Sequence, residues 1–221
     1  MSDIDFDSAL IASFFRIVAD EGWARASVAG AAQAAALPLA EARARFPGRP
    51  SVLVRFGRQA DQAALADIPA DGSVRDKLFD MLMRRFDALQ AHRPGIAALL
   101  RALPSDPKTA LLLACITHRS MRWMLQAAGV STAGLRGELR VRGLMAVWVW
   151  TLRAWERDES ADLSGTMAAL DAALRRAERL AGWLNGGLGA GSASDAESQP
   201  DVPAAEPGDE APAATPESPP A

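Results

Sequence analysis

The stretch 27-SVAGAAQAAALPLAEARARF-46 predicts a helix-turn-helix. Ser27 is expected to cap a short helix over 28–35, residues 36–38 form a turn, and a second short helix covers 39–46. This is the spacing of the helix pair with which many regulators read DNA. The stretch therefore predicts a fold that contains a helix-turn-helix near its N-terminus.

The second helix of this pair has few side chains that suit a DNA contact. Such a helix reads base edges and phosphates through polar and basic groups. This one carries Ala40, Ala42 and Ala44, while Glu41 would face the phosphates with the wrong charge. The interpretation is a retained scaffold whose reading surface is eroded. If DNA is bound at all, the contacts would come from the arginines in and around the stretch: Arg25, Arg43, Arg45 and Arg49.

Composition favours an all-helical protein. Half of the 221 residues are apolar, Tyr is absent, and Ala and Leu dominate. The net charge of -3 is unevenly distributed, because residues 187–221 hold seven acids and no base, which leaves 20 acids and 24 bases in residues 1–186. A body with a net charge of +4 is too weakly basic to establish a nucleic-acid partner.

Apolar spacing, caps and breakers predict about nine helices. Ser73 is expected to cap the fifth helix, Asp106 the seventh, and Ser160 or Asp162 the ninth. Besides the two short helices above, the predicted elements are 8–21, 50–66, a helix after Ser73 that carries Leu78 to Leu89, 94–103, 107–128, 132–157 and a ninth that ends near 185.

The predicted organisation has three parts. The loop Pro69-Ala70-Asp71-Gly72 separates a helix-turn-helix-like subdomain, 1–68, from a helical ligand-binding domain, 69–185. The remainder, 186–221, begins with a glycine run and has seven prolines in its last 22 residues. It is predicted to be a disordered acidic tail, because it has too little apolar surface to offset its chain entropy.

Localisation signals point to the cytoplasm. The acidic start MSDIDFDSAL does not resemble a signal peptide, and no apolar run is long enough to span a bilayer. The one cysteine, Cys115, fits a reducing compartment. We expect a soluble cytoplasmic protein that touches the inner membrane surface as a peripheral protein.

Few residues suggest catalysis or metal binding. Cys115 and His118 lie three residues apart on one helix, but a zinc site needs about four ligands and no others lie nearby. The acids Asp158, Glu159 and Asp162 precede a helix start, where capping explains them better than acid–base chemistry. With no phosphate loop or nucleophile elbow either, the expectation is a protein that is not an enzyme and needs no cofactor or metal.

Aromatic residues in the seventh and eighth helices suggest an apolar cavity. The eighth helix carries Trp148, Trp150 and Trp155 and is apolar around much of its circumference. For any single residue, plain core packing is the simpler explanation. For the group, the mixture of Trp, Met and Ala leaves irregular space that would suit a lipid or quinone. The predicted cavity residues are Leu112, Ile116, Met124, Leu144, Trp148 and Thr151, with the Thr151 hydroxyl a possible donor to a ligand oxygen.

Residues spread over most of the chain resemble two related families. The helix layout is similar to that of the TetR family of repressors. The segment from Gly22-Trp23 to about Leu180 resembles the coenzyme Q protein nine family, an accessory lipid-binding protein of ubiquinone biosynthesis. The resemblance is carried by Gly22-Trp23, Ala34 to Leu37, Phe46, Leu53, Phe56, Gln59, Leu78, Leu82 to Arg84, Leu89, Leu103-Pro104, Ala110 to Leu112, Met121, Trp123, Gly129, Arg140, Leu144, Ala146, Trp148, Thr151, Asp158, Ser160, Asp162, Thr166 and Leu170.

This resemblance implies a TetR-like fold without gene regulation. It implies a homodimer that binds an isoprenoid lipid or quinone intermediate and presents it to the demethoxyubiquinone hydroxylase at a membrane surface. The chain departs from the families at several points. Gly137-Glu138 replaces an aromatic pair that eukaryotic relatives carry, and the amphipathic end helix leaves a trace only at Leu180, Trp183, Leu184 and Leu188. TetR repressors usually have Gly in the turn, a small residue followed by Thr in the reading helix, and Tyr three residues before its last Phe. This chain has Ala36, Glu41 and Arg43 at those places.

Two functions remain open from the sequence. The first is a lipid-binding accessory protein of ubiquinone biosynthesis. The alternative is a TetR-type DNA-binding regulator whose helical domain senses an apolar ligand.

Overall fold

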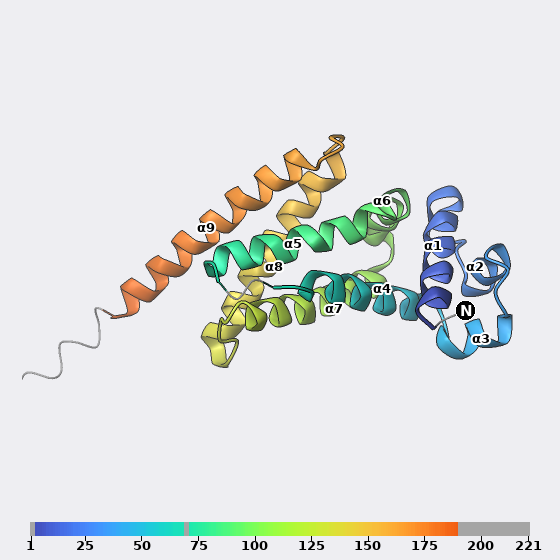
Figure 1. Cartoon of the computed structure of the whole chain (residues 1–221), viewed down its shortest axis with the longest axis horizontal. Coiled ribbons are helices and arrows are strands. Elements are labelled where there is room, and N and C mark those ends of the chain that lie inside the picture. The colour runs from blue at the N-terminus through green and yellow to red at the C-terminus, as the bar shows by residue number, and fades with distance from the viewer. Residues whose placement is uncertain (1–2, 69–70, 190–221) are drawn as a thin grey trace, which may run out of the picture. The chain divides into compact units, whose positions relative to one another are not determined.

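The computed structural model describes residues 3–68 and 71–189 (Figure 1). Over these residues the regular elements are all helical, which confirms the predicted fold class. They are α1 (Asp3–Glu21), α2 (Val28–Ala34), α3 (Leu39–Arg45), α4 (Arg49–Leu65), α5 (Val74–Gln90), α6 (Arg93–Ala102), the short 3-10 helix η1 (Leu103–Ser105), α7 (Pro107–Ala127), α8 (Gly134–Arg157) and α9 (Ser164–Gly189).

The predicted caps form as the sequence indicates. Ser27 Oγ accepts a hydrogen bond from Gly30 N at 3.0 Å, and Asp106 Oδ1 accepts one from Thr109 N at 3.1 Å. At α9 both candidate residues act, because Ser164 N donates to Ser160 Oγ at 3.0 Å and to Asp162 Oδ1 at 3.1 Å. Such caps satisfy amide groups that have no partner within the helix, which is why local sequence placed these helix starts well.

One predicted start is wrong by five residues. The first helix begins at Asp3 rather than Ser8. Phe6 is 1% exposed and extends the buried stripe of Leu10 and Phe14 by one turn, so packing stabilises a longer helix than the prediction gave.

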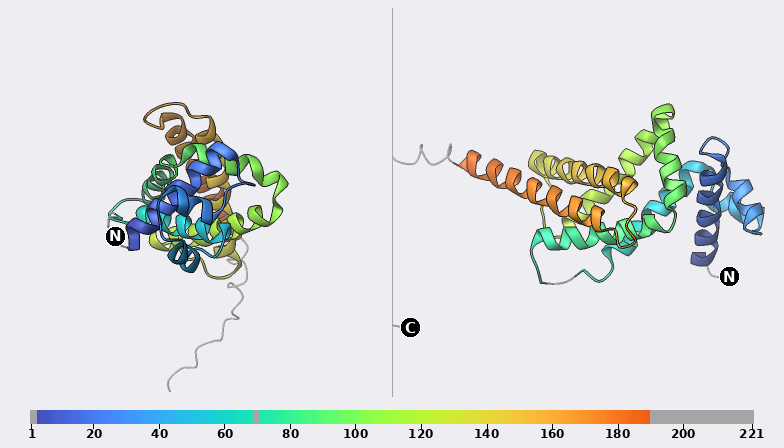
Figure 2. Two further views of the ribbon diagram at one scale, coloured as in Figure 1. Left: turned by 90° about the vertical axis from the view of Figure 1, so that its right-hand side faces the viewer. Right: turned by 90° about the horizontal axis from the view of Figure 1, so that it is seen from above.

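The N-terminal helices form a small three-helix group. α1 packs against α2, and α2 packs against α3 (Figures 1 and 2). Phe14 and Trp23 meet edge to face with ring centroids 5.9 Å apart, and Phe46 at the end of α3 is buried. The helix-turn-helix layout predicted from residues 27–46 is therefore present.

Ala36 keeps the turn conformation for which glycine is the usual residue. Its φ is +52°, in the left-handed region, which costs roughly 1–2 kcal/mol for a residue with a Cβ. The turn is retained because Leu37 N donates to Ala32 O at 2.8 Å and the Leu37 side chain is buried. Alanine therefore adopts here a backbone conformation that glycine adopts more readily.

A glycine lets α1 approach the C-terminal helices closely. A Cβ at Gly95 of α6 would overlap the carbonyl oxygen of Phe15 on α1, so no larger residue fits there without a shift. Asp106, at the start of α7, adds a polar link, because it accepts a hydrogen bond from Trp23 Nε1 at 3.0 Å. Hydrogen bonds from Trp23 and Thr109 lower the pKa of Asp106 to about 2. The three-helix group is thus joined to α6 and α7 as well as to α4.

The remaining helices build the C-terminal half. α4 packs against α5 and α7, and α7 packs against α8 (Figure 1).

Hydrogen bonds from Ser160 and Thr166 hold the pKa of Asp158 well below its usual range, and Thr166 N lies 2.6 Å from its Oδ2. The prediction that Asp158 and Asp162 act at the helix start agrees with these contacts.

The described residues up to Trp183 form one compact unit. The predicted subdomain boundary falls at residues 69–70, which lie outside the described residues, so that boundary stays a prediction. The same holds for the proposed disorder of the tail and for the side chains of Trp183, Leu184 and Leu188. No described helix is long and apolar enough to cross a membrane.

Candidate functional site

A cavity of about 490 Å³ lies among α4, α5, α6, α7 and α8. Its volume is in the range of small-molecule sites, which are mostly apolar with a few placed polar groups. Phe15 of α1 also reaches the wall. The apolar part of the wall includes Leu53, Phe56, Leu89, Leu99, Leu113 and Leu152.

Most of the charged residues of the cavity wall are basic. Arg85, Arg101, Arg153 and Glu156 all line it. Arg101, Arg153 and Glu156 are exposed, whereas only 6% of the Arg85 side chain is exposed. The wall therefore combines an apolar surface with one buried cation and an excess of positive charge.

Arg85 belongs to a polar cluster that joins three helices. It forms an ion pair with Asp61 of α4, and Ser120 Oγ of α7 donates to Asp61 Oδ2 at 2.6 Å. The guanidinium also lies over the ring of Trp148 on α8, 5.0 Å from its centroid. Burial lowers the pKa of Arg85 to about 10, so the side chain remains charged at neutral pH.

Sequence reasoning missed Arg85, although a signal was present. Leu78, Leu82, Arg85 and Leu89 follow helical spacing on one face of α5. A charged residue within an otherwise apolar, buried stripe is rare unless it is paired or bound. That position should have been singled out as a candidate site residue.

The structure brings only two of the six predicted cavity residues into this wall. Ile116 and Trp148 line it. Leu144 lies instead in a separate hollow with Leu78, Leu125 and Leu174, and Leu112 packs partly buried against the core. Met124 and Thr151 are both fully buried, at 0% exposure.

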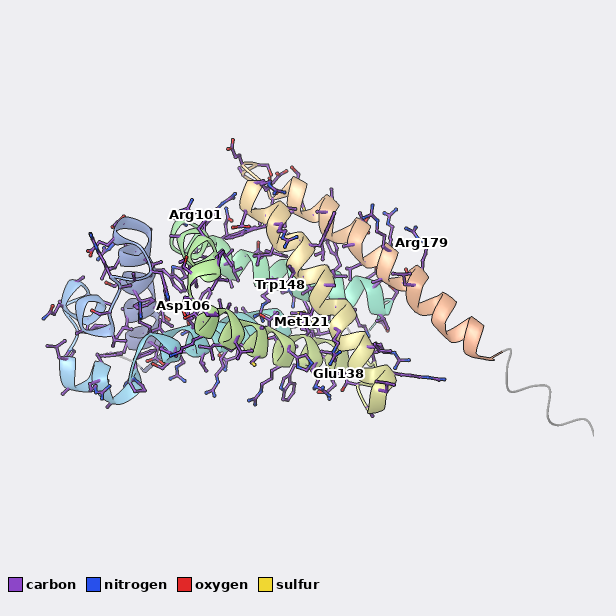
Figure 3. The ribbon with its side chains drawn as sticks, turned by 180° about the vertical axis from the view of Figure 1, so that it is seen from behind. Arg101, Asp106, Met121, Glu138, Trp148 and Arg179 are labelled. Atoms are coloured by element: carbon purple, nitrogen blue, oxygen red, sulfur yellow. The ribbon has the colours of Figure 1, made fainter. Side chains whose placement is uncertain are left out.

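The error on α8 is a shift of one residue. The predicted stripe 144, 148, 151 and 155 faces the packed core. There Trp148, which Figure 3 labels on α8, stacks on Phe86 with ring centroids 4.5 Å apart. The stripe that faces the cavity is Met145, Val149, Leu152 and Glu156, with Trp148 on its edge. One residue turns a helix by about 100°, so neighbouring stripes face different surroundings.

Thr151 does not offer its hydroxyl to a ligand in this structure. Its Oγ1 donates to Val147 O at 2.9 Å, the backbone bond that a helical Thr often makes. Because Thr151 is also fully buried, its predicted role as a donor to a quinone oxygen is corrected to a structural one.

Three of the four candidate DNA-binding arginines are engaged within the protein. Arg43 Nη1 donates to Pro47 O at 2.6 Å, Arg45 Nη2 lies 2.6 Å from Glu41 Oε1, and Arg49 Nη1 donates to Trp23 O at 2.8 Å. Arg45 also reaches the buried Asp7, and Arg49 lies over the Trp23 ring. Arg25 is exposed. A phosphate contact by the first three would have to break or share these bonds.

The residues considered for a metal edge have other surroundings. His118 Nε2 lies 2.8 Å from Glu138 Oε1, and Cys115 is exposed. Glu138 also contacts Arg122 at 2.7 Å, and the hydrogen bond from His118 is the first cause of its lowered pKa. Gly137 is buried, and a Cβ there would overlap the Thr132 backbone. The Gly137-Glu138 pair thus helps to hold α8 against α7 and the loop before it.

Comparison with solved structures identifies similar folds. A TetR transcriptional regulator from Nitrosomonas europaea has a TM-score of 0.64 and 19% identity, covering 79% of this chain and 99% of its own. A tetR-family regulator from Streptomyces coelicolor has a TM-score of 0.60 and 20% identity, covering 86% and 87%. One from Rhodococcus sp. RHA1 has a TM-score of 0.56 and 15% identity, covering 80% and 97%.

These likenesses show a TetR-like fold, as the sequence predicted. Sequence identities of 15–20% are evidence for a shared fold and not for a shared function. No family model and no curated protein matches the chain.

Replacing Trp148 separates core packing from ligand contact. Trp155 is the matched control, because it is fully buried, touches Phe86 and lies outside the cavity wall. Trp155→Ala should cost about 3–5 kcal/mol of unfolding free energy. Trp148→Ala should cost less but lose more copurified apolar ligand, measured by urea denaturation and by mass spectrometry of extracts. If Trp148→Ala keeps all of the ligand and loses as much stability as Trp155→Ala, Trp148 is a core residue and not a ligand contact.

Proposed function

We propose that this protein binds an apolar small molecule in the cavity among α4 to α8 and does not act as a sequence-specific DNA reader. The observation that carries the proposal is the apolar wall contributed by five helices around about 490 Å³. The engagement of Arg43, Arg45 and Arg49 within the protein supports the second half of it. We further propose that the protein acts by binding, without a reaction of its own.

The sequence resemblance supports a finer form of this proposal. In that form the ligand is an isoprenoid lipid or a quinone intermediate, and the protein presents it to the demethoxyubiquinone hydroxylase during transient contact with a membrane. The Gly137-Glu138 stretch is occupied with internal contacts to Thr132, His118 and Arg122. We therefore do not assign the docking of a hydroxylase to that stretch.

The second candidate is a DNA-binding regulator. The retained helix-turn-helix and the fold likeness to three TetR-family regulators favour it. In this case the same cavity would receive the signal molecule. The two candidates thus share the ligand and differ in whether α3 reads DNA.

Lipid analysis tests the proposed ligand class. Protein purified from its native host without detergent should carry an apolar compound at a substantial fraction of one per chain. The reason is that covering an apolar wall with an apolar ligand is more favourable than leaving it in contact with water. Organic extraction followed by mass spectrometry would identify it. A quinone or isoprenoid would support the finer proposal, another lipid would support the general one alone, and empty protein that also takes up no added lipid would contradict both.

A DNA titration separates the two candidates. Binding should be weak, indifferent to sequence and strongly reduced by salt, because α3 offers alanines and Glu41 where base contacts are needed. Fluorescence anisotropy with the DNA that flanks the gene, against a scrambled duplex, measures this. A complex that survives physiological salt and resists competitor DNA would favour the regulator.

We also propose a homodimer that forms through α8. Leu139, Gly143, Ala146 and Trp150 follow helical spacing and are exposed, with Leu139 at 52% and Trp150 at 56%. Two small residues between two large apolar ones allow close helix approach, and an exposed apolar stripe of this kind commonly marks an interface. Sedimentation velocity should show a dimer that Trp150→Glu dissociates; a native monomer at tens of micromolar would refute it.

A further inference from the structure

Arg85 is an unusual residue for the wall of an apolar cavity. Its side chain is only 6% exposed and it lies on the α5 stripe with Leu82 and Leu89. Burying a guanidinium is strongly unfavourable unless its charge and its N–H groups find partners. The partners present therefore show which side of the guanidinium is already engaged.

The guanidinium is paired in charge, but its hydrogen-bonding capacity is not filled. Asp61 forms an ion pair with it, and the Trp148 ring covers a face of the group at 5.0 Å. Nε and Nη1 are buried and have no hydrogen-bond partner among the described residues, and the Arg85 side chain lines the cavity. The edge of an arginine that carries Nε is one of the edges that bind a carboxylate through two parallel hydrogen bonds.

The rest of the wall favours an anion at this point. Arg101 and Arg153 add two positive charges, against one negative charge from Glu156. A cationic head group would meet this excess of positive charge, and a neutral one would leave the Nε donor of Arg85 weakly satisfied. A doubly charged phosphate needs more hydrogen-bond donors and more positive charge than the guanidinium edge of Arg85 offers. The charge of Arg85 is already partly neutralised by Asp61 on its opposite side.

We propose that the cavity binds an amphiphile with a carboxylate head group, which accepts hydrogen bonds from the free edge of Arg85 while its chain lies along the leucine-rich wall. This proposal rests on the general form of the proposed function, an apolar ligand in this cavity, and it names a different ligand class from the neutral quinone or isoprenoid of the finer form. Trp148 holds the guanidinium plane in place, and Asp61 with Ser120 fixes its orientation from α4 and α7.

Matched ligands of one chain length test the head group. Full-length protein, stripped of lipid, is titrated at pH 7.4 with decanoate, 1-decanol and decyl phosphate by isothermal calorimetry. Decanoate should bind about tenfold or more tightly than decanol, a difference of about 1.4 kcal/mol. Decyl phosphate should bind less tightly than decanoate.

Variants assign the preference to Arg85. Arg85→Met should remove the advantage of decanoate and leave decanol binding within about threefold. Because this change leaves the half-buried Asp61 without its cation, the double variant Arg85→Met with Asp61→Asn removes both charges and should give the same result in a stable fold. Arg142→Met, at an exposed arginine of α8 that lies outside the cavity wall, is the control and should change decanoate binding by less than about threefold.

The outcomes separate this proposal from the proposed function. Equal binding of decanoate and decanol, a preference that survives in both Arg85 variants, or tighter binding of decyl phosphate would overturn the carboxylate proposal and leave the apolar cavity standing. Failure of all three ligands to bind the native protein would overturn both.

Discussion

The ion pair between the half-buried Asp61 and the buried Arg85 constrains the C-terminal half of this protein. It ties α4 to α5, and Ser120 brings α7 to the same point through its bond to Asp61. Removing Asp61 would leave the Arg85 charge buried without compensation, which typically costs 3–5 kcal/mol in a buried pair. The relative positions of three cavity-forming helices therefore depend on this contact, and the cavity lies beside it.

The N-terminal helices depend on a different kind of contact. Asp7 is buried at 2% exposure and pairs with Arg45 of α3 and Arg55 of α4. Arg49 likewise caps the backbone around Trp23. These arginines therefore hold the N-terminal helices together. Their contacts give them a structural use that does not depend on a nucleic acid.

Both halves meet through close contact rather than through a flexible joint. Gly95 of α6 admits the backbone of Phe15, and Trp23 donates to Asp106 at the start of α7. Phe15 also reaches the cavity wall. The group α1 to α3 is therefore packed directly onto the helices that would hold a ligand, which is an arrangement that either proposed function can use.

The sequence by itself determined the helices and much of the fold class. Caps such as Ser27, Ser73 and Asp106 act within a few residues of their own position, and apolar spacing repeats along a single helix. Only the tertiary structure decided which stripe of α8 faces the cavity, because that depends on the rotation of α8 against α5 and α7, and one residue changes the face by about 100°. It likewise decided that Arg85 meets Asp61 and Trp148, residues 24 positions before it and 63 after it in the chain, since such pairings follow from the packing of whole helices. Local rules therefore gave reliable elements, whereas the site required the long-range contacts that bring those elements together.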